Sequence, residues 1–204
     1  MANFGPATFR SFKNPIFRTF FLSMLGQMAG MNMQMLARSL LIYRLTGSAT
    51  ILGIMSLANA LPMFFASLFG GVIADRLQKK SVVLGGQIGS SLVSLGIALS
   101  LTFGYLDADK PGSWWILVVA SLFQGTIMGL MMPSRQAIIR EIVPQNDLMN
   151  AVGLNSLGMN SLRLIAPAVA GFLIEYYGFP AVYYTMTGMY FMASIFILPL
   201  PNTS

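Results

Sequence analysis

The hydrophobic positions of the chain form long uninterrupted stretches, separated by short clusters of charged and turn-forming residues. Five of these stretches contain no charged residue: 19–37, 45–74, 81–106, 111–134 and 176–204. A further apolar stretch, 148–177, is interrupted near its middle by Arg163. Because about 20 mostly apolar residues are enough for a helix to cross the hydrocarbon core of a bilayer, the pattern predicts a series of membrane-spanning helices.

Turn signals between the stretches set the ends of six predicted helices. These signals are Thr46-Gly47-Ser48, the polar segment 107–113, the segment 144–147 and Gly178-Phe179-Pro180. They give a transmembrane domain over residues 17–200, with helices at about 17–45, 49–74, 81–105, 114–141, 148–176 and 180–199. A re-entrant segment is the alternative, but the lengths favour six full spans. The expected fold class is therefore an all-α membrane protein with six transmembrane helices.

Composition supports this reading and excludes several kinds of chemistry. The chain is 55% hydrophobic and 9% charged, against about 25% charged residues in a soluble domain. It contains no histidine and no cysteine, which excludes Ser-His and Cys-His catalysis, imidazole and thiolate metal sites, and disulfides. The 12 basic residues are scattered and form no basic face, so nucleic-acid binding is not expected. We therefore expect that the protein is not an enzyme and that it holds neither a cofactor nor a metal ion.

The basic residues predict how the helices are oriented in the membrane. With the N-terminus inside, two basic residues, Arg44 and Lys110, fall on outer loops. Both termini are then expected in the cytoplasm, because basic residues accumulate on the inner side. Residues 1–16 are expected to form an interfacial cytoplasmic segment, and residues 201–204 to begin a central linker. Seven basic residues fall on inner segments: Arg10, Lys13, Arg18, Arg76, Lys79, Lys80 and Arg140.

The chain also resembles itself at an offset of one hundred residues. Gly71 aligns with Gly171 and Asp75 aligns with Glu175, each carboxylate closing a predicted helix before a short loop. The first of these loops is predicted inside and the second outside. Two three-helix units of opposite orientation are the internal symmetry of many transporters, so we expect two inverted three-helix repeats. Chance matches at common glycines are the alternative.

Several motifs resemble those of a known family. Gly71-x-x-x-Asp75-Arg76-x-x-Lys79-Lys80 resembles the loop 2–3 signature of the major facilitator superfamily, with Gln78 where glycine is usual. Tyr43-x-Leu45-Thr46-Gly47-Ser48-Ala49 and Pro133-Ser134-Arg135-Gln136-Ala137 resemble the branch that holds the transmembrane secretion effector proteins and the enterobactin exporter. Arg163-x-x-Ala166-Pro167-x-x-Ala170-Gly171 is similar to the helix 5 motif of drug exporters, with alanine for glycine at 166 and 170.

This resemblance implies a fold, a location and a mechanism. The chain would be the N-terminal six-helix half of a twelve-helix transporter in the bacterial cytoplasmic (inner) membrane. Such a transporter exports small amphipathic compounds, drug-like or siderophore-like, by alternating access, in many cases as an antiporter. The loop motif of Gly71, Asp75, Arg76, Lys79 and Lys80 would act as a gate against the second half. The helix 5 motif would involve Arg163, Pro167 and Gly171.

Polar and methionine side chains on the predicted spans are candidates for the substrate pathway, because polar groups in a bilayer are expensive. Gln27, Met31, Gln34 and Arg38 follow intervals of four, three and four, which places them on one helix face. Flexible methionines beside them suit varied apolar ligands, with a copper(I) path as the less favoured alternative. Interhelical hydrogen bonding or a packing clamp is the alternative role for the remaining candidates, which are Asn59, Gln124, Asn155 and Arg163.

The expected partners are the lipid bilayer, a small amphipathic substrate, and either a second six-helix half or a second copy of the chain. A truncated subunit that does not transport, or a half-size transporter that works as a homodimer, are the alternatives. Every Asp and Glu falls in a loop or at the end of a predicted span, and none lies deep in the membrane. If transport is coupled to protons, the carrier would be Glu141, Asp75 or a residue of the second half.

Overall fold

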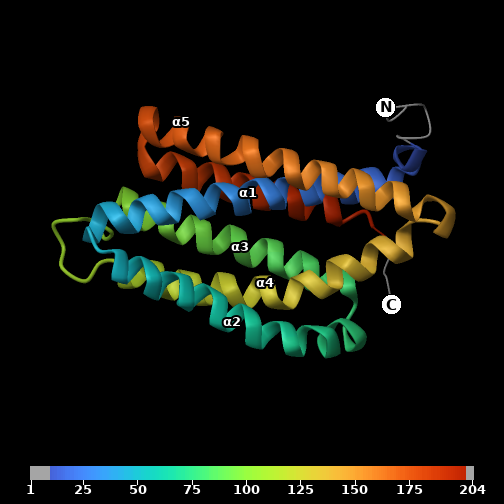
Figure 1. Cartoon of the computed structure of the whole chain (residues 1–204), viewed down its shortest axis with the longest axis horizontal. Helices are drawn as coiled ribbons and strands as arrows, with labels where there is room; N and C mark the ends of the chain where they lie inside the picture. The colour runs from blue at the N-terminus through green and yellow to red at the C-terminus, as the bar shows by residue number, and fades with distance from the viewer. Residues whose placement is uncertain (1–9, 201–204) are drawn as a thin grey trace.

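The computed structural model describes residues 10–200, with the side chains of these residues apart from 10, 13 and 71–76. Every regular element in this part of the chain is a helix. The long helices lie side by side and form an elongated bundle (Figure 1). In chain order the elements are η1 (Arg10–Lys13), α1 (Pro15–Thr46), α2 (Ala49–Arg76), α3 (Lys79–Thr102), α4 (Trp115–Ile142), η2 (Gln145–Asp147) and α5 (Leu148–Ile197).

Much of the bundle is long and apolar enough to lie within a bilayer. Four helical segments meet the requirements of length and hydropathy for crossing a membrane: Ala49–Gly70, Lys79–Thr102, Trp115–Ile142 and Gln145–Ile197. The surface of the bundle carries many large apolar side chains, such as Leu68 and Phe172, which a soluble protein would bury. The protein is an integral membrane protein that crosses the membrane more than once.

The last helix, α5, is one continuous element by hydrogen bonding but not one straight rod. A straight helix of 50 residues would be about 75 Å long, more than twice the thickness of a hydrocarbon core. At Gly178 the backbone has φ 82° and ψ 174°, a conformation open to glycine and strained for other residues. The chain turns back there, and the two arms of α5 lie side by side (Figure 1). The sequence placed a break at this same Gly178-Phe179-Pro180 step.

Glycines lie at the places where the helices of the bundle approach one another most closely. α1 packs mainly against α5, whereas α4 packs mainly against α2 and also against α3. A Cβ atom added to Gly125 or Gly129 of α4 would collide with backbone carbonyl oxygens of α2. A Cβ added to Gly30 of α1 would lie 2.7 Å from the ring of Tyr190 in the second arm of α5. Small residues let helix backbones approach closely, which is how helices associate where water provides no driving force.

Buried polar side chains connect the helices inside the bundle. The amide nitrogen of Gln87 in α3 donates a 2.7 Å hydrogen bond to the hydroxyl of Ser23 in α1. That hydroxyl donates in turn to the backbone carbonyl of Ala193 in α5, at 2.8 Å. The amide nitrogen of Gln124 in α4 donates to the hydroxyl of Ser90 in α3, at 3.1 Å. These bonds fix the rotation of four helices relative to one another, and so the faces that remain open.

Candidate functional site

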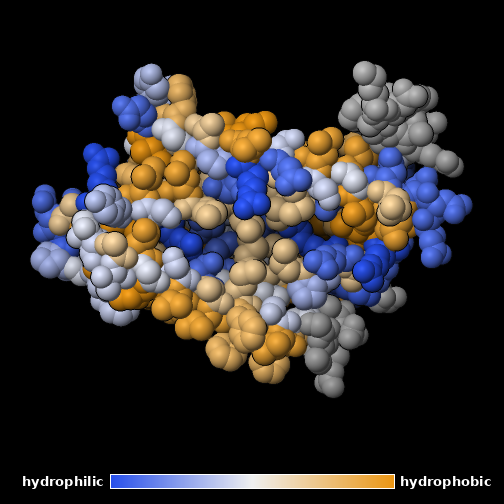
Figure 2. Space-filling model, viewed as in Figure 1, coloured by the Kyte–Doolittle hydropathy of each residue, from blue (hydrophilic) through white to orange (hydrophobic). Residues whose placement is uncertain are grey.

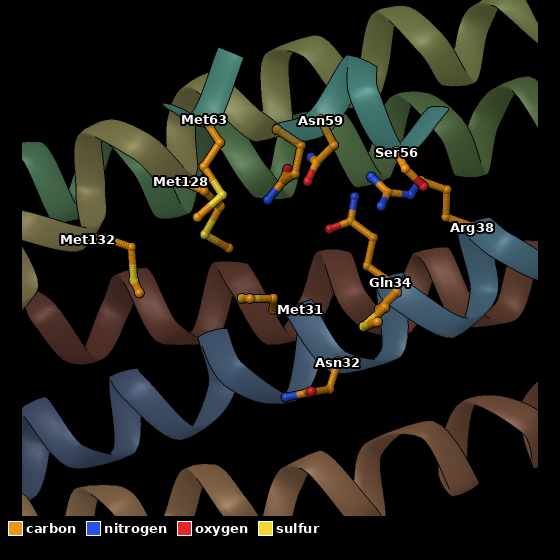
Figure 3. Close-up of a pocket in the computed structure, with 11 residues that line it drawn as sticks. Met31, Asn32, Gln34, Arg38, Ser56, Asn59, Met63, Met128 and Met132 are labelled. Carbon is orange, nitrogen blue, oxygen red and sulfur yellow. The ribbon is translucent and has the colours of Figure 1, made fainter. Parts of the chain in front are cut away.

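A groove of about 320 Å³ runs between α1, α2 and α4 (Figure 3). α1 contributes its middle and second half, α2 its middle, and α4 the part that follows Gln124. Figure 2 shows hydrophilic residues gathered in a hollow across the middle of this face of the molecule, between more hydrophobic margins. The lining residues are Met31, Asn32, Gln34, Met35, Arg38, Ser56, Asn59, Met63, Gln124, Met128 and Met132.

One part of the groove is polar and positively charged. Arg38 donates a 3.4 Å hydrogen bond to the hydroxyl of Ser121, and the amide nitrogen of Asn59 donates to the backbone carbonyl of the same residue, at 3.3 Å. The hydroxyl of Tyr190 donates to the side-chain oxygen of Gln34, at 3.2 Å. These bonds orient neutral partners around Arg38, and no carboxylate is among the residues that line the groove. This part of the groove therefore offers donors and a positive charge.

The other part of the groove is lined by thioethers. Met31, Met63, Met128 and Met132 come from three different helices and gather in one region of the groove (Figure 3). Methionine is unbranched and polarisable, and it adapts its shape to an irregular apolar surface. Among the residues that the structure describes, no group of three or more acidic side chains is arranged to hold a metal ion. The groove thus joins an adaptable apolar surface to a set of polar anchors.

Next to the groove, a smaller recess of about 90 Å³ lies between α1, α4 and the first arm of α5. It shares Met132 with the groove, and α5 supplies Asn155 and Met159. Arg135 of α4 lines this recess, and its side chain is 6% exposed. Its lining residues are Phe20, Met24, Met28, Met132, Arg135, Gln136, Ile139, Asn155 and Met159.

The structure gathers most of the predicted pathway residues in one place. Met31, Gln34, Arg38, Asn59 and Gln124 all line the groove. The spacing of Met31, Gln34 and Arg38 indicated a common face of α1. The sequence did not show that α2 and α4 supply the other sides of the groove. Asn59 and Gln124 also make hydrogen bonds between helices, which was the alternative role expected for them.

Three predicted pathway residues lie outside the groove: Gln27, Asn155 and Arg163. Asn155 lines the smaller recess, where its amide nitrogen lies 3.7 Å from the sulfur of Met159. Gln27 lies inside the bundle with an exposed fraction of 0%, and neither of its amide atoms has a hydrogen-bond partner within the described part of the chain. Gln27 follows the same spacing as its neighbours on α1, but its position along the helix places it against packed helices instead of the groove.

The helix 5 motif lies away from the groove. Arg163 is exposed and lines neither the groove nor the recess. Pro167 lies within the first arm of α5, and a Cβ added to Gly171 would lie 4.0 Å from Leu36 of α1. Arg163 therefore faces outward from this part of α5, and within residues 10–200 no hydrogen bond or ion pair makes it a clamp inside the bundle.

The loop 2–3 motif is described only in part. The side chains of Gly71, Asp75 and Arg76 lie outside the described residues. Lys79 forms an ion pair with Glu141 at the end of α4, with 2.5 Å between Nζ and Oε1. Lys80 donates to the backbone carbonyls of Leu198 and Leu200, both at 2.6 Å. The two lysines thus tie the start of α3 to the ends of α4 and α5.

The sequence pattern alone did not indicate Arg135 as a site residue. It stands directly after the charge-free stretch 111–134 and so marks the boundary of that stretch. α4 continues to Ile142, which places Arg135 two turns before the end of the helix. The available signal was its position inside a predicted span of 114–141, the same argument that had selected Arg163.

Membrane-spanning helices that enclose a groove with polar anchors and an adaptable apolar surface are typical of membrane transporters. The chain belongs to the transmembrane secretion effector family of the major facilitator superfamily, whose family model matches residues 6–202.

Relatives in three bacteria are named as transport proteins. The chain is 24% identical over 164 residues to the uncharacterized MFS-type transporter YfiS of Bacillus subtilis. It is 28% identical over 153 residues to the staphyloferrin A transporter of Staphylococcus aureus, and 28% identical over 152 residues to the multi-drug resistance efflux pump PmrA of Streptococcus pneumoniae. The alignments cover 80%, 75% and 73% of this chain, but only 37%, 37% and 35% of the respective relatives.

Proposed function

We propose that the chain forms the N-terminal half of an exporter of small amphipathic molecules that works by alternating access. The groove between α1, α2 and α4 is the observation that carries this proposal. Its volume of about 320 Å³ lies at the lower end of the range for small-molecule pockets. A pocket that is open on one side and only half-enclosed by one unit is what alternating access between two units requires.

The lining of the groove supports an amphipathic substrate. Met31, Met63 and Met128 offer apolar contacts that adjust to different shapes, which favours a site that accepts several compounds. Gln34 and Arg38 offer fixed polar contacts to one end of the substrate. The names of two relatives, a staphyloferrin A transporter and a multi-drug efflux pump, are consistent with cargo that is both polar and apolar.

We further propose that the helices form six membrane spans arranged as two inverted three-helix repeats. The two arms of α5 would be the fifth and sixth spans, since Gly178 lies between them. α1 packs against α5, and α4 packs against α2 and α3, so each repeat's first helix lies against the other repeat. This exchange of first helices supports a pseudo-symmetric pair.

The second unit that completes the groove is proposed to be another six-helix unit, on the same polypeptide or on a second copy of the chain. The groove side of α1 exposes apolar side chains such as Met35, which is 69% exposed. Large exposed apolar areas next to a polar groove fit an interface between helical units better than a lipid-facing surface alone. A membrane subunit that does not transport remains the alternative function.

For location, we propose the bacterial cytoplasmic membrane with both termini inside. η1 and the end of α5 lie at the same end of the bundle (Figure 1). That end also carries Lys79, Lys80 and Arg140, which the positive-inside tendency places in the cytoplasm.

Proton coupling also stays a proposal. Of its two candidates on this chain, Glu141 is held by Lys79, and Asp75 lies outside the described side chains.

An efflux assay with an obstructed groove tests the transport proposal. Met31→Trp places a large ring in the groove, whereas Leu92→Trp adds the same ring to a 62% exposed position of α3 outside it. In cells that carry the complete transporter, we expect Met31→Trp to reduce export of a fluorescent amphipathic dye at least tenfold, with Leu92→Trp near the parent rate. Equal membrane levels of both variants are the control. Undiminished export by Met31→Trp would contradict a substrate path through the groove.

Crosslinking tests the nature of the second unit. The chain contains no cysteine, so a single Met35→Cys substitution gives one defined thiol on the groove side of α1. If two copies complete the groove, a short bis-maleimide should trap a dimer through Cys at 35, and not through Cys at 92 in a matched Leu92→Cys variant. A monomer in both variants, together with active export, would place the second unit on the same polypeptide.

A further inference from the structure

Arg135 is a buried charge with no counter-charge among the residues that the structure describes. Its side chain is 6% exposed, and it has neither a hydrogen bond nor an ion pair with any residue that the structure describes. Burying an unpaired charge costs several kcal/mol, so native proteins pair such a group or leave it to meet a ligand. Most of its surroundings in the recess are apolar: Phe20, Met24, Met28 and Ile139.

The acidic side chains that the structure describes all lie elsewhere. They belong to loops or helix ends, none lines the groove or the recess, and Glu141 is already bound to Lys79. The two polar neighbours of Arg135 in the recess are the amides Gln136 and Asn155, which are neutral. The described acidic residues are Asp107, Asp109, Glu141, Asp147 and Glu175.

The groove and the recess share Met132, and together they are called the channel here. A second arginine stands in this channel. Arg38 lines the groove, where it donates a hydrogen bond to the neutral hydroxyl of Ser121. Along α1, the distance from Phe20 in the recess to Arg38 is about 27 Å, since a helix rises 1.5 Å per residue. The channel therefore has a positive charge near each end and a methionine-lined apolar surface between them.

We propose that this channel selects amphipathic organic anions, and that Arg135 binds their carboxylate or phosphate head while the methionines hold the apolar body. This inference rests on the proposed export function, and it adds the charge of the substrate. An arginine binds a carboxylate or phosphate through two parallel hydrogen bonds, which are about twice as strong as neutral ones. A cation with the same apolar body would meet two like charges and no carboxylate among the described lining residues.

Three probes that differ only in their head group test the proposal. They are 11-(dansylamino)undecanoic acid, its methyl ester, and the amine in which an aminomethyl group replaces the carboxyl group. Binding is followed by dansyl fluorescence on the complete transporter in nanodiscs of uncharged lipid, with empty nanodiscs as the blank. We expect the carboxylate to bind about tenfold more tightly than the ester, and the ammonium to bind most weakly.

Substitutions at position 135 assign the preference to this residue. Arg135→Gln should weaken carboxylate binding about tenfold, to the level of the ester, while ester binding stays unchanged and shows that the channel is intact. Arg135→Lys should restore part of the preference, because lysine keeps the charge but loses the paired geometry. Arg140→Gln is the matched control, since Arg140 is an exposed arginine of the same helix.

The outcomes separate this inference from the proposed function. If none of the three probes binds, the groove is not an amphipath site and both proposals fail. If all three bind equally, or if Arg135→Gln weakens them equally, the groove binds amphipaths and the anion inference alone is overturned. Repeating the titration with phosphatidylglycerol in the nanodiscs identifies the source of the anion. Competition by the lipid assigns the head-group site to a lipid phosphate, and its absence assigns the site to soluble cargo.

Discussion

Gly125 of α4 lies against the backbone carbonyl oxygen of Asn59 in α2 so closely that no side chain fits between them. One turn further on, Gly129 stands in the same relation to the carbonyl of Met63. Asn59 and Met63 are also lining residues of the groove. The contact between the two backbones therefore sets the position of α2 at the groove, and with it the width of the channel.

Replacing Gly125 by alanine is expected to destabilise the protein by about 1–3 kcal/mol, because the added methyl group must push α2 away from α4. Gly96→Ala is the matched control, since a Cβ at this helical glycine of α3 meets nothing within 4 Å. The control should be neutral or slightly stabilising, as alanine favours a helix by about 0.5–1 kcal/mol over glycine. Thermal unfolding in detergent, followed by size-exclusion chromatography, measures both. Equal melting temperatures for the two variants would contradict this contact.

Gly178→Ala is expected to destabilise the reversal of α5. The φ of 82° is left-handed, and a residue with a Cβ is strained there by about 1–3 kcal/mol. Gly188→Ala, in the second arm of the same helix and without a neighbour within 4 Å of its added Cβ, serves as the comparison. We expect a lower melting temperature and a lower yield of folded protein for Gly178→Ala alone. A Gly178→Ala variant as stable as Gly188→Ala would mean that the turn tolerates a side chain.

The bond between Gln87 and Ser23 can be tested with a double-mutant cycle. Ser23→Ala removes the acceptor of the Gln87 amide and leaves it buried without its partner, at a cost of about 1–3 kcal/mol. Gln87→Leu alone should cost less, because Ser23 keeps its bond to the carbonyl of Ala193. The double variant should lose less stability than the sum of the two single variants, since no amide is then left unpaired. Strict additivity in thermal unfolding would show that the two side chains act independently.

The orientation can be tested with thiols on exposed loops. Lys110 and Gln145 are both exposed, and residues 1–204 contain no cysteine. With both termini in the cytoplasm, Lys110→Cys should react with a membrane-impermeant maleimide on intact cells. Gln145→Cys should react only after the cells are permeabilised. The opposite pattern would reverse the proposed topology, and labelling of both on intact cells would contradict the placement of the loops on opposite sides.

The two arginines in the spans show where sequence reasoning succeeds and where it stops. A charge in an apolar stretch is visible in the sequence, and this made Arg163 a candidate. Whether such a charge faces the bundle, the channel or the surroundings depends on how its helix is rotated, and that rotation is set by contacts with residues far away in the chain. Arg163 is exposed on α5, whereas Arg135 is enclosed in the recess.

The sequence by itself determined that this is a membrane protein of the major facilitator superfamily, because long apolar stretches and the loop motif are local features. It also showed that Met31, Gln34 and Arg38 share one helix face, since that follows from the period of the helix. Only the tertiary structure decided that α2 and α4 complete the groove, that Gln27 is enclosed within the bundle, and that Arg135 stands in a recess with no charged partner in the described part of the chain. Each of these depends on the rotation and spacing of packed helices, which glycine contacts and buried hydrogen bonds between distant residues determine.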